Sequence, residues 1–131
     1  MIYRQTKQSA GADLSASIET IIPAGKIVLV GTGYNLNKID WSDYYGTSDM
    51  FFLLTARSSL AYKTGLLLAN GVGVIDSDYK DEIKVMLFNP TNEDVIIEAG
   101  TRIAQLIAMP FLPVFPALDN ERNGGFGSTS K

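Results

Sequence analysis

The sequence predicts an all-β domain of the sandwich or jelly-roll type with one short helix. Short segments in which apolar and polar residues alternate recur along most of the chain. Turn-forming residues separate these segments at short intervals. Strands and helices do not alternate as they would around a parallel sheet. A length of 131 residues fits one domain with a substantial core.

Six segments have the alternation expected of β-strands. They are residues 18–22, 26–31, 50–55, 83–88, 95–98 and 102–109. Proline, glycine and asparagine predict turns between them at residues 23–25, 89–92 and 99–100. The single helix is predicted over residues 58–63, and Thr64-Gly65 would end it.

Residues 70–88 are predicted to form a hairpin with an acidic turn. Gly71 and Gly73 leave one face of the first arm without side chains, so a ligand could approach the main chain closely. Main-chain N–H and C=O groups can read the polar edge of a planar molecule. Asp76 and Tyr79 follow directly. The segment is therefore either a ligand-binding hairpin or an ordinary surface hairpin.

The composition restricts the chemistry that the chain can perform. It contains no cysteine and no histidine, which excludes disulfides, thiolate nucleophiles, zinc–thiolate sites and an imidazole base. A general base must then be a carboxylate, a lysine or a tyrosine. A metal ion would be a hard one, such as Mg²⁺, held by oxygen atoms.

The charge distribution restricts the partners. A net charge of −3 argues against a broad nucleic-acid-binding surface. No apolar run reaches the length of a membrane span, and the lack of cysteine favours a reducing, cytoplasmic compartment. Arg57, Arg102 and Arg122 each lie in a distinctive segment. That pattern is typical of a few placed phosphate contacts.

Three segments place polar groups where an anion or a metal would bind. Arg57, Ser58 and Ser59 enter the predicted helix, either as an anion site or as helix caps. Gln105 shares a face with apolar neighbours, so its amide would bind either a phosphate oxygen or the backbone. Asp13 is either a turn residue or a partner of a hydrated Mg²⁺ ion.

Residues 1–113 are expected to form the β domain and residues 114–131 a flexible C-terminal arm. Prolines keep the start of the arm extended, and its end is polar and rich in glycine. The end of the arm reads Phe126-Gly127-Ser128-Thr129. In one interpretation the Phe126 ring stacks on a base and the hydroxyls of Ser128 and Thr129 bind phosphates. In the other, the segment is an ordinary disordered tail. Residues 40–49, around Trp41, are predicted to be a surface loop, with a binding patch as the alternative.

Five segments resemble, in the same order, the five motifs of the homotrimeric dUTPases. They read Ala-Gly-Ala-Asp-Leu, Ala-Arg-Ser-Ser-Leu-Ala, Asn-Gly-Val-Gly-Val-Ile-Asp-Ser-Asp-Tyr, Gly-Thr-Arg-Ile-Ala-Gln-Leu-Ile and Gly-Gly-Phe-Gly-Ser-Thr, within residues 10–129. The resemblance implies a jelly-roll-like, distorted β-barrel subunit, a threefold homotrimer and active sites shared between subunits. It also implies hydrolysis of dUTP to dUMP and pyrophosphate with Mg²⁺ on the triphosphate.

The resemblance further implies roles for the residues of the predicted hairpin. Asp76 would orient and activate the water that attacks the α-phosphorus. Tyr79 would pack under the deoxyribose and leave no room for a ribose 2′-hydroxyl. Asn70 and the main chain around Gly73 and Lys84 would read the uracil edge.

The other motifs would bind the triphosphate and cover the base. The resemblance assigns the phosphates to Arg57, Ser58, Ser59, Gln105 and Arg122. Asp13 would act on Mg²⁺ through water. From a neighbouring subunit's arm, Phe126 would cover the uracil, with Gly127, Ser128 and Thr129 beside the terminal phosphates.

The chain departs from the family pattern at two places. Asp81 stands where the family usually has glycine, and it adds a negative charge to the turn. Arg122 precedes Phe126 by four residues instead of five, and Ser130 replaces the last glycine of the motif. One alternative is a dCTP deaminase, which would need a glutamate within residues 85–87. The other is a non-catalytic trimeric jelly-roll module that binds a nucleotide or regulates a partner.

Overall fold

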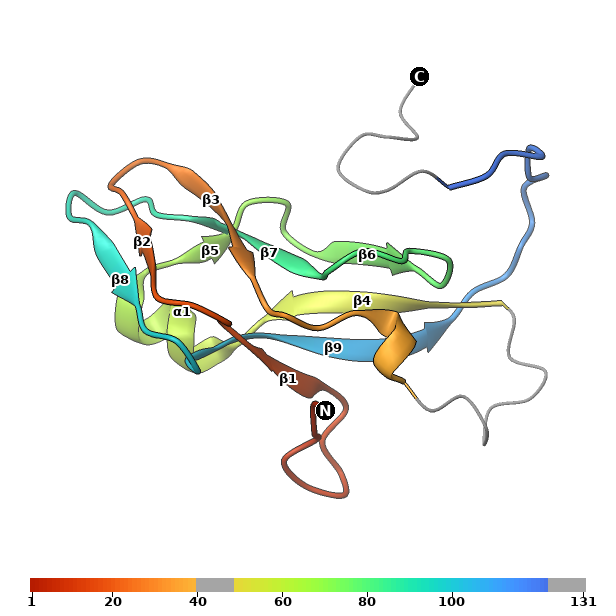
Figure 1. Ribbon diagram of the computed structural model, residues 1–131, viewed down its shortest axis with the longest axis horizontal. Helices are drawn as coiled ribbons and strands as arrows, with labels where there is room; N and C mark the ends of the chain where they lie inside the picture. Colours follow the sequence, from red (N-terminus) through yellow and green to blue (C-terminus); the bar gives the residue numbers. More distant parts are fainter. Residues whose placement is uncertain (40–48, 123–131) are drawn as a thin grey trace.

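The computed structural model describes residues 1–39 and 49–122 (Figure 1). The strands are β1 Ala12–Ser15, β2 Thr20–Ile22, β3 Ile27–Gly31, β4 Met50–Ala56, β5 Leu67–Leu68, β6 Gly73–Asp76, β7 Lys84–Phe88, β8 Val95–Ile97 and β9 Arg102–Pro110. A 3₁₀ helix, η1, covers Leu36–Lys38, and the helix α1 covers Ser58–Thr64. Within the described ranges, no helix has the length and apolar character needed to cross a membrane.

The described strands form three antiparallel sheets, in the orders β1-β9-β4-β6, β2-β8 and β3-β7-β5. The first and the third lie one above the other (Figure 1), and the core lies between them. Leu14, Leu54 and Leu106 enter the core from the first sheet, and Val30 and Val85 enter it from the third. The fold is thus the all-β, jelly-roll-like class that the sequence predicts, with sheets that do not close into one barrel over these residues.

The strands predicted from alternation are confirmed. They correspond to β2, β3, β4, β7, β8 and β9, with ends that differ by up to two residues. The helix α1 is confirmed as well, and Gly65 follows it with a φ of 78°. That left-handed conformation suits glycine and explains why the helix ends there.

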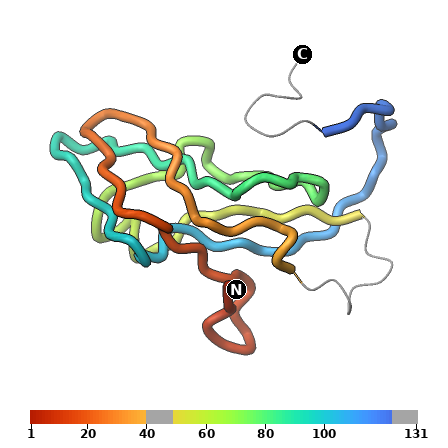
Figure 2. Tube along the Cα trace, viewed as in Figure 1, coloured from red at the N-terminus to blue at the C-terminus, as the bar shows by residue number. Residues whose placement is uncertain are grey.

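The elements that the sequence analysis missed are short. β1 has four residues, β5 has two and η1 has three, so none contains enough alternation to reveal a period. β1 forms because it pairs in the antiparallel direction with the edge of β9; the traces of the two segments lie close together in Figure 2. Residues 40–48 of the predicted loop around Trp41 lie outside the described residues.

The predicted hairpin is wrong, because its two arms do not pair with each other. β6 pairs with β4, whereas β7 lies between β3 and β5 in the other sheet. Gly73 is one reason why β6 can lie against β4. A Cβ atom at that position would be 3.0 Å from the Cβ of Leu54. The arms therefore diverge into two layers and leave a space between their edges.

Asn89 is a fully buried amide that links two turns. Its Nδ2 donates to the carbonyls of Ile22 and Glu93 at 2.9 and 2.7 Å. Its Oδ1 accepts from the N–H and the hydroxyl of Thr91 at 3.0 and 2.7 Å. The side chain is thus hydrogen-bonded at both ends, as a buried polar group requires.

Replacing Asn89 with alanine is expected to lower the free energy of unfolding by about 2–4 kcal/mol, because several buried main-chain groups lose their partners. Urea denaturation at a fixed protein concentration measures this loss. Thr91→Val is the smaller perturbation, since it removes one hydroxyl and leaves the amide in place. A loss below about 0.5 kcal/mol for Asn89→Ala would contradict the structural role.

Candidate active site

A pocket of about 200 Å³ lies between the diverging strands β6 and β7. Part of its wall is apolar and comes from Leu54, Ile83 and Met86. Six residues that the sequence analysis singled out also line it: Asn70, Gly73, Asp76, Tyr79, Lys84 and Arg122. The structure therefore places the third motif and the start of the fifth around one cavity.

The pocket is bordered by strand edges that carry main-chain hydrogen-bonding groups. The carbonyl of Met86 accepts from the N–H of Ala69 at 2.8 Å. Because main-chain groups alternate in direction along a strand, those of Lys84 point to the same side as those of Met86. β5 ends at Leu68, before it reaches Lys84. The N–H and C=O of Lys84 are thus directed toward the pocket, where a planar polar ligand could bind them.

Tyr79 is a buried residue of the pocket wall that is held by hydrogen bonds from its main chain and its hydroxyl. Its side chain is buried, its N–H donates to the carbonyl of Asp76 at 3.0 Å, and its hydroxyl donates to the carbonyl of Glu82 at 2.8 Å. Burial raises the pKa of the Tyr79 phenol above 10.0, nearby Asp81 and Glu82 raise it further, and Arg122 lowers it. The hydroxyl therefore stays protonated at neutral pH and acts as a donor.

Asp76 also lines the pocket and is bound by an arginine from the C-terminal segment. Its side chain is 55% exposed. The Nη2 of Arg122 donates to one of its carboxylate oxygens, and the Nε of Arg122 donates to Asp78 at 2.7 Å. Arg122 thus bridges two carboxylates of one turn. An exposed carboxylate beside a ligand pocket is suited to orient a water molecule.

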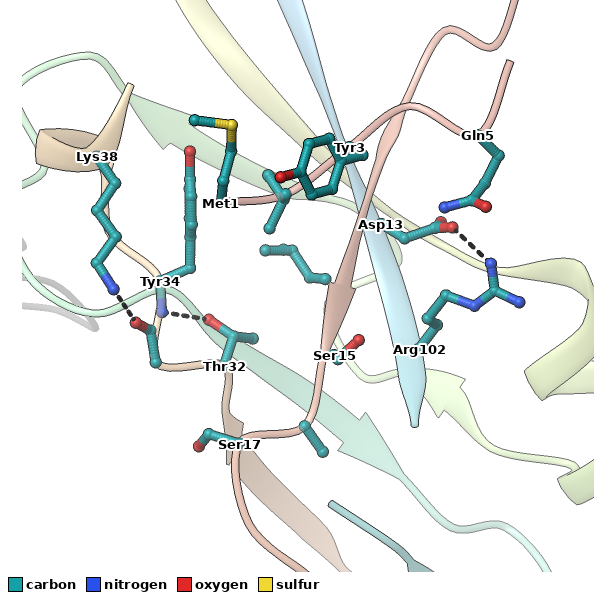
Figure 3. A pocket seen from close by; sticks show the side chains of 14 residues that line it. Met1, Tyr3, Gln5, Asp13, Ser15, Ser17, Thr32, Tyr34, Lys38 and Arg102 are labelled. Carbon is teal, nitrogen blue, oxygen red and sulfur yellow. Dashed lines mark hydrogen bonds and ion pairs between the residues drawn. The ribbon is translucent and has the colours of Figure 1, made fainter. Parts of the chain in front are cut away.

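A second cluster of charged residues surrounds Asp13 on β1. Its carboxylate pairs with Arg57 Nε at 2.9 Å and with Arg102 Nη1 at 3.3 Å. The Asp13 side chain is 10% exposed, whereas that of Arg102 is 47% exposed. Figure 3 shows Asp13 and Arg102 facing each other at the edge of a cavity of about 420 Å³. Two guanidinium groups against one carboxylate leave a net positive site that suits a phosphate.

Gln105 and the start of α1 adjoin this cluster. Gln105 Nε2 donates to the carbonyl of Ala56 at 3.3 Å, so the amide has a backbone partner in this structure. Its position depends on Gly11, where a Cβ atom would be 2.6 Å from Gln105 Oε1. Arg57 occupies the N-cap position of α1 without a capping side-chain bond. Ser58 and Ser59 therefore do not act as the caps that one interpretation of the sequence proposed.

The end of β6 and the start of α1 lie at opposite ends of β4 (Figure 1), and they carry the two clusters. Asp76 is opposite Phe51 at one end, and Arg57 follows Ala56 at the other. Six residues of strand correspond to a separation of about 20 Å. One chain therefore does not bring Asp76 together with Arg57, Ser58, Ser59, Gln105 and Asp13.

The comparisons with known proteins identify the family of this chain. The sequence model of the dUTPase family matches residues 1–130. The chain belongs to the dUTPase family. A deoxyuridine 5′-triphosphate nucleotidohydrolase from Desulfitobacterium hafniense is 44% identical over 95% of this chain and 83% of its own length. The one from Nautilia profundicola is 40% identical over 97% of this chain and 88% of its own.

A solved dUTPase structure has the same fold. The crystal structure of the dUTPase from Streptococcus mutans matches with a TM-score of 0.76 and 37% identity, over 88% of this chain and 89% of that one. The native dUTPase of EIAV matches with a TM-score of 0.67 and 25% identity, over 93% and 92%. The family model covers residues 1–130 and therefore includes both clusters described above.

The chain's own side chains do not form a metal site in the described part of this dUTPase. Residues 1–39 and 49–122 contain no group of three or more acidic side chains that could hold an ion. Asp13, the predicted partner of Mg²⁺, has both carboxylate oxygens paired with arginines. These residues therefore do not fit a protein-held Mg²⁺ ion in the unliganded chain.

Sequence reasoning missed several contributors to the two clusters. Arg102 was singled out as distinctive but received no role, and Gly11 was not assigned to the site. Asp78 lies in the third motif but received no role, and Glu82 lies outside the five motifs. Only the fold shows that Asp78 contacts Arg122 and that Glu82 contacts Tyr79. Four further predicted residues lie outside the described residues: Phe126, Gly127, Ser128 and Thr129.

Proposed function

We propose that this protein hydrolyses dUTP to dUMP and pyrophosphate in nucleotide metabolism. The observation that carries the proposal is the pocket between β6 and β7, where a bare main-chain edge, a buried tyrosine and an exposed carboxylate meet. The relatives named above are deoxyuridine 5′-triphosphate nucleotidohydrolases, which supports the same substrate here.

Uracil recognition would rest on the main chain of the two diverging strands. The N–H and C=O of Lys84 offer a donor and an acceptor, and the edge of β6 at Gly73 offers more. Asn70 borders the same pocket. Cytosine presents the opposite donor and acceptor pattern at two adjacent ring positions. Each mismatch would leave a buried group unpaired, which costs about 1–3 kcal/mol.

Sugar selectivity would come from Tyr79. The buried ring would support the deoxyribose, and a ribose 2′-hydroxyl would collide with it. Because the ring is packed on the core and hydrogen-bonded through its hydroxyl, it cannot move aside without losing these contacts. UTP would therefore be a poor substrate.

Asp76 would act as the general base for the attacking water. The water oxygen bonds to the α-phosphorus, its proton passes to Asp76, and the bond between the α-phosphorus and the bridging oxygen of the β-phosphate breaks. Arg122 would leave Asp76 and bind the phosphates, since their oxygens carry more negative charge than a carboxylate. This exchange frees the carboxylate only when the substrate is present.

The triphosphate would be bound by the Asp13 cluster of another subunit. Asp76 must lie within about 3 Å of a water molecule at the α-phosphorus, so residues that bind the same phosphates must be near. Arg57 of the same chain is about 20 Å away along β4. Arg57, Ser58, Ser59 and Gln105 of a second subunit would therefore complete the site, as in a threefold homotrimer.

The outer face of the four-stranded sheet is suited to that subunit contact. Cross-strand partners share a face, which places Leu53, Ile107 and Val74 together between the two clusters. Val74 is 62% exposed. Nearby, Thr55 Oγ1 is buried without a hydrogen-bond partner among the described residues. A second copy would cover the apolar residues and could supply that partner.

Mg²⁺ would arrive with the substrate. It commonly binds nucleotide phosphates and keeps several water molecules. The chain's residues would then contact the hydrated ion only indirectly, through Asp13. Its chemistry would be to neutralise charge on the triphosphate.

The domain organisation proposed is a β domain over residues 1–113 and a C-terminal arm over residues 114–131. Val114, Phe115 and Leu118 expose 71%, 85% and 84% of their surface in the single chain, which supports a path over a neighbouring subunit. Phe126 would then stack on the uracil, with Gly127, Ser128 and Thr129 beside the phosphates. Because the substrate is a soluble metabolite of the nucleotide pool, we also propose a cytoplasmic location.

The test is pyrophosphate release from four nucleotides by the purified protein with Mg²⁺. The proposal predicts turnover of dUTP and little release from dCTP, dTTP or UTP. Ammonia release from dCTP would identify a deaminase instead. Tight dUTP binding without turnover would identify a binding module, and both results would refute the proposed hydrolysis.

A further inference from the structure

The peptide group between Glu82 and Ile83 connects Tyr79 to a distant loop. Its C=O accepts the Tyr79 hydroxyl at 2.8 Å, and its N–H donates to the carbonyl of Tyr34 at 2.8 Å. A peptide group is planar, so the direction of its N–H fixes the direction of its C=O. The position of the Tyr79 hydroxyl therefore depends on where Tyr34 holds this peptide.

The loop of residues 32–34, here called the anchor loop, binds the same turn at two more points. The carboxylate of Glu82 accepts from the N–H of Gly33 at 2.7 Å. The hydroxyl of Thr32 donates to the carbonyl of Ile83 at 2.6 Å. Thr32 Oγ1 also accepts from the N–H of Tyr34 at 3.2 Å, as Figure 3 shows. Side-chain and main-chain contacts thus hold Glu82 and Ile83 from one side.

Glycines make room for this connection. A Cβ atom on Gly31 would be 2.8 Å from Glu82 Oε2, so a side chain there would displace the carboxylate. Gly33 has a φ of 66°, a conformation that suits glycine. Its carbonyl accepts from Lys38 Nζ at 2.9 Å, which braces the anchor loop from the other side (Figure 3).

Apart from the ion pairs that Arg122 forms with Asp76 and Asp78, the turn that bears Tyr79 has little support from side chains. Ser77, Asp78, Lys80 and Asp81 are all exposed, so they contribute little packing to it. Tyr79 itself is buried, but a ring held by packing alone can tilt if its backbone shifts. The contacts of Glu82 therefore limit the shift of the backbone that would let the Tyr79 ring tilt.

We propose that Glu82 and the anchor loop are positioning residues that set the enzyme's preference for deoxyribose over ribose. The inference rests on the proposed function, since it concerns the sugar bound against Tyr79. Glu82 does not line the pocket. Its carboxylate binds the N–H of Gly33 and so holds the Glu82–Ile83 peptide, whose carbonyl holds the Tyr79 hydroxyl. Rejection of a ribose 2′-hydroxyl requires that the Tyr79 ring stays in place. If the ring moved away, the 2′-hydroxyl would fit beside it without a steric clash.

The decisive experiment compares kcat and KM for dUTP and for UTP in Glu82→Ala, Glu82→Gln and Asp81→Asn. Glu82→Ala is expected to lower the dUTP-over-UTP ratio of kcat/KM by about three- to tenfold, the range of one lost hydrogen bond. The change should come from a lower KM for UTP, with kcat for dUTP nearly unchanged. Glu82→Gln keeps an acceptor oxygen, so its dUTP-over-UTP ratio of kcat/KM should stay close to that of the unmodified protein.

Asp81→Asn is the matched control. It removes a negative charge from the adjacent residue without removing a contact of the anchor loop. A ratio that falls equally in Asp81→Asn and Glu82→Ala would assign the effect to charge near Tyr79 and overturn the proposal. A ratio that is unchanged in Glu82→Ala would also overturn it.

A second pair of variants covers the case in which Glu82→Ala fails to fold. Thr32→Val removes the hydroxyl that bonds Ile83 and Tyr34, whereas Thr32→Ser keeps it, so only the first should lower the ratio. Adding Thr32→Val to Tyr79→Phe should change the dUTP-over-UTP ratio little further. Thr32 acts on the ratio through the position of the Tyr79 hydroxyl, and Tyr79→Phe removes that hydroxyl. Full additivity would contradict the proposal.

The outcomes separate this inference from the proposed function. An unmodified protein that does not hydrolyse dUTP refutes both. An unmodified protein that prefers dUTP, with variants that keep the same preference, refutes only the role of the anchor loop.

Discussion

Replacing Asp76 with asparagine is expected to lower kcat for dUTP by about 10³-fold, the scale of a lost general base. The amide keeps the shape of the side chain but accepts a proton poorly. Substrate affinity should be unchanged or tighter, since Arg122 loses one of its carboxylate partners and becomes available to phosphate. Single-turnover kinetics give the chemical step, and calorimetry with an α,β-imido analogue of dUTP gives the affinity.

Asp78→Asn is the matched control for that variant. Asp78 pairs with the same arginine at 2.7 Å but does not line the pocket. Its kcat should stay within about threefold of the unmodified protein. A kcat for Asp76→Asn that is also within this range would mean that another group activates the water.

Truncation after Leu118 is expected to lower kcat/KM by about 10²-fold or more, through loss of phosphate contacts and of the cover over the base. It removes Arg122 together with Phe126, Ser128 and Thr129. The β domain should remain folded, because residues 119–122 contribute nothing to the buried core. Circular dichroism and sedimentation report the fold and the assembly, and steady-state kinetics report the loss.

A shorter truncation separates the effect of losing the Phe126–Thr129 motif from the effect of shortening the arm. Removal of Ser130 and Lys131 keeps Phe126 and both hydroxyl residues, so its kinetics should match those of the full chain. Normal kinetics in the chain truncated after Leu118 would exclude any catalytic role for the arm.

The sequence predicted the strands that are long enough to show a period. β3, β4, β7 and β9 have five or more residues, and β2 and β8 were found because clear turn residues bound them. β1 and β5 were missed, since their formation depends on a neighbouring edge. The pairing of β6 was predicted wrongly, because local alternation does not reveal which partner a strand takes. Contacts such as that between Gly73 and Leu54 decide it.

The sequence predicted those residues of the candidate site that lie together within one continuous motif. The pocket contains Asn70, Asp76 and Tyr79 as the third motif suggests. The partners of the charged groups were not predictable, because ion pairs between distant segments depend on the fold. Asp13 illustrates this limit, since its motif gives no sign that its carboxylate pairs with two arginines from other segments. The connection from Glu82 to Gly33 is a second example.

In the proposed trimer, one active site combines Asp76 of one subunit with Arg57 of another. The most direct test of this arrangement mixes two inactive variants, Asp76→Asn and Arg57→Ala, unfolds them together and refolds them. Random assembly pairs an intact Asp76 with an intact Arg57 of another subunit in about one quarter of the sites. The mixture should therefore recover about a quarter of the unmodified activity, whereas each variant treated alone stays inactive. A mixture that stays inactive, although both variants assemble together, would contradict a site shared between subunits.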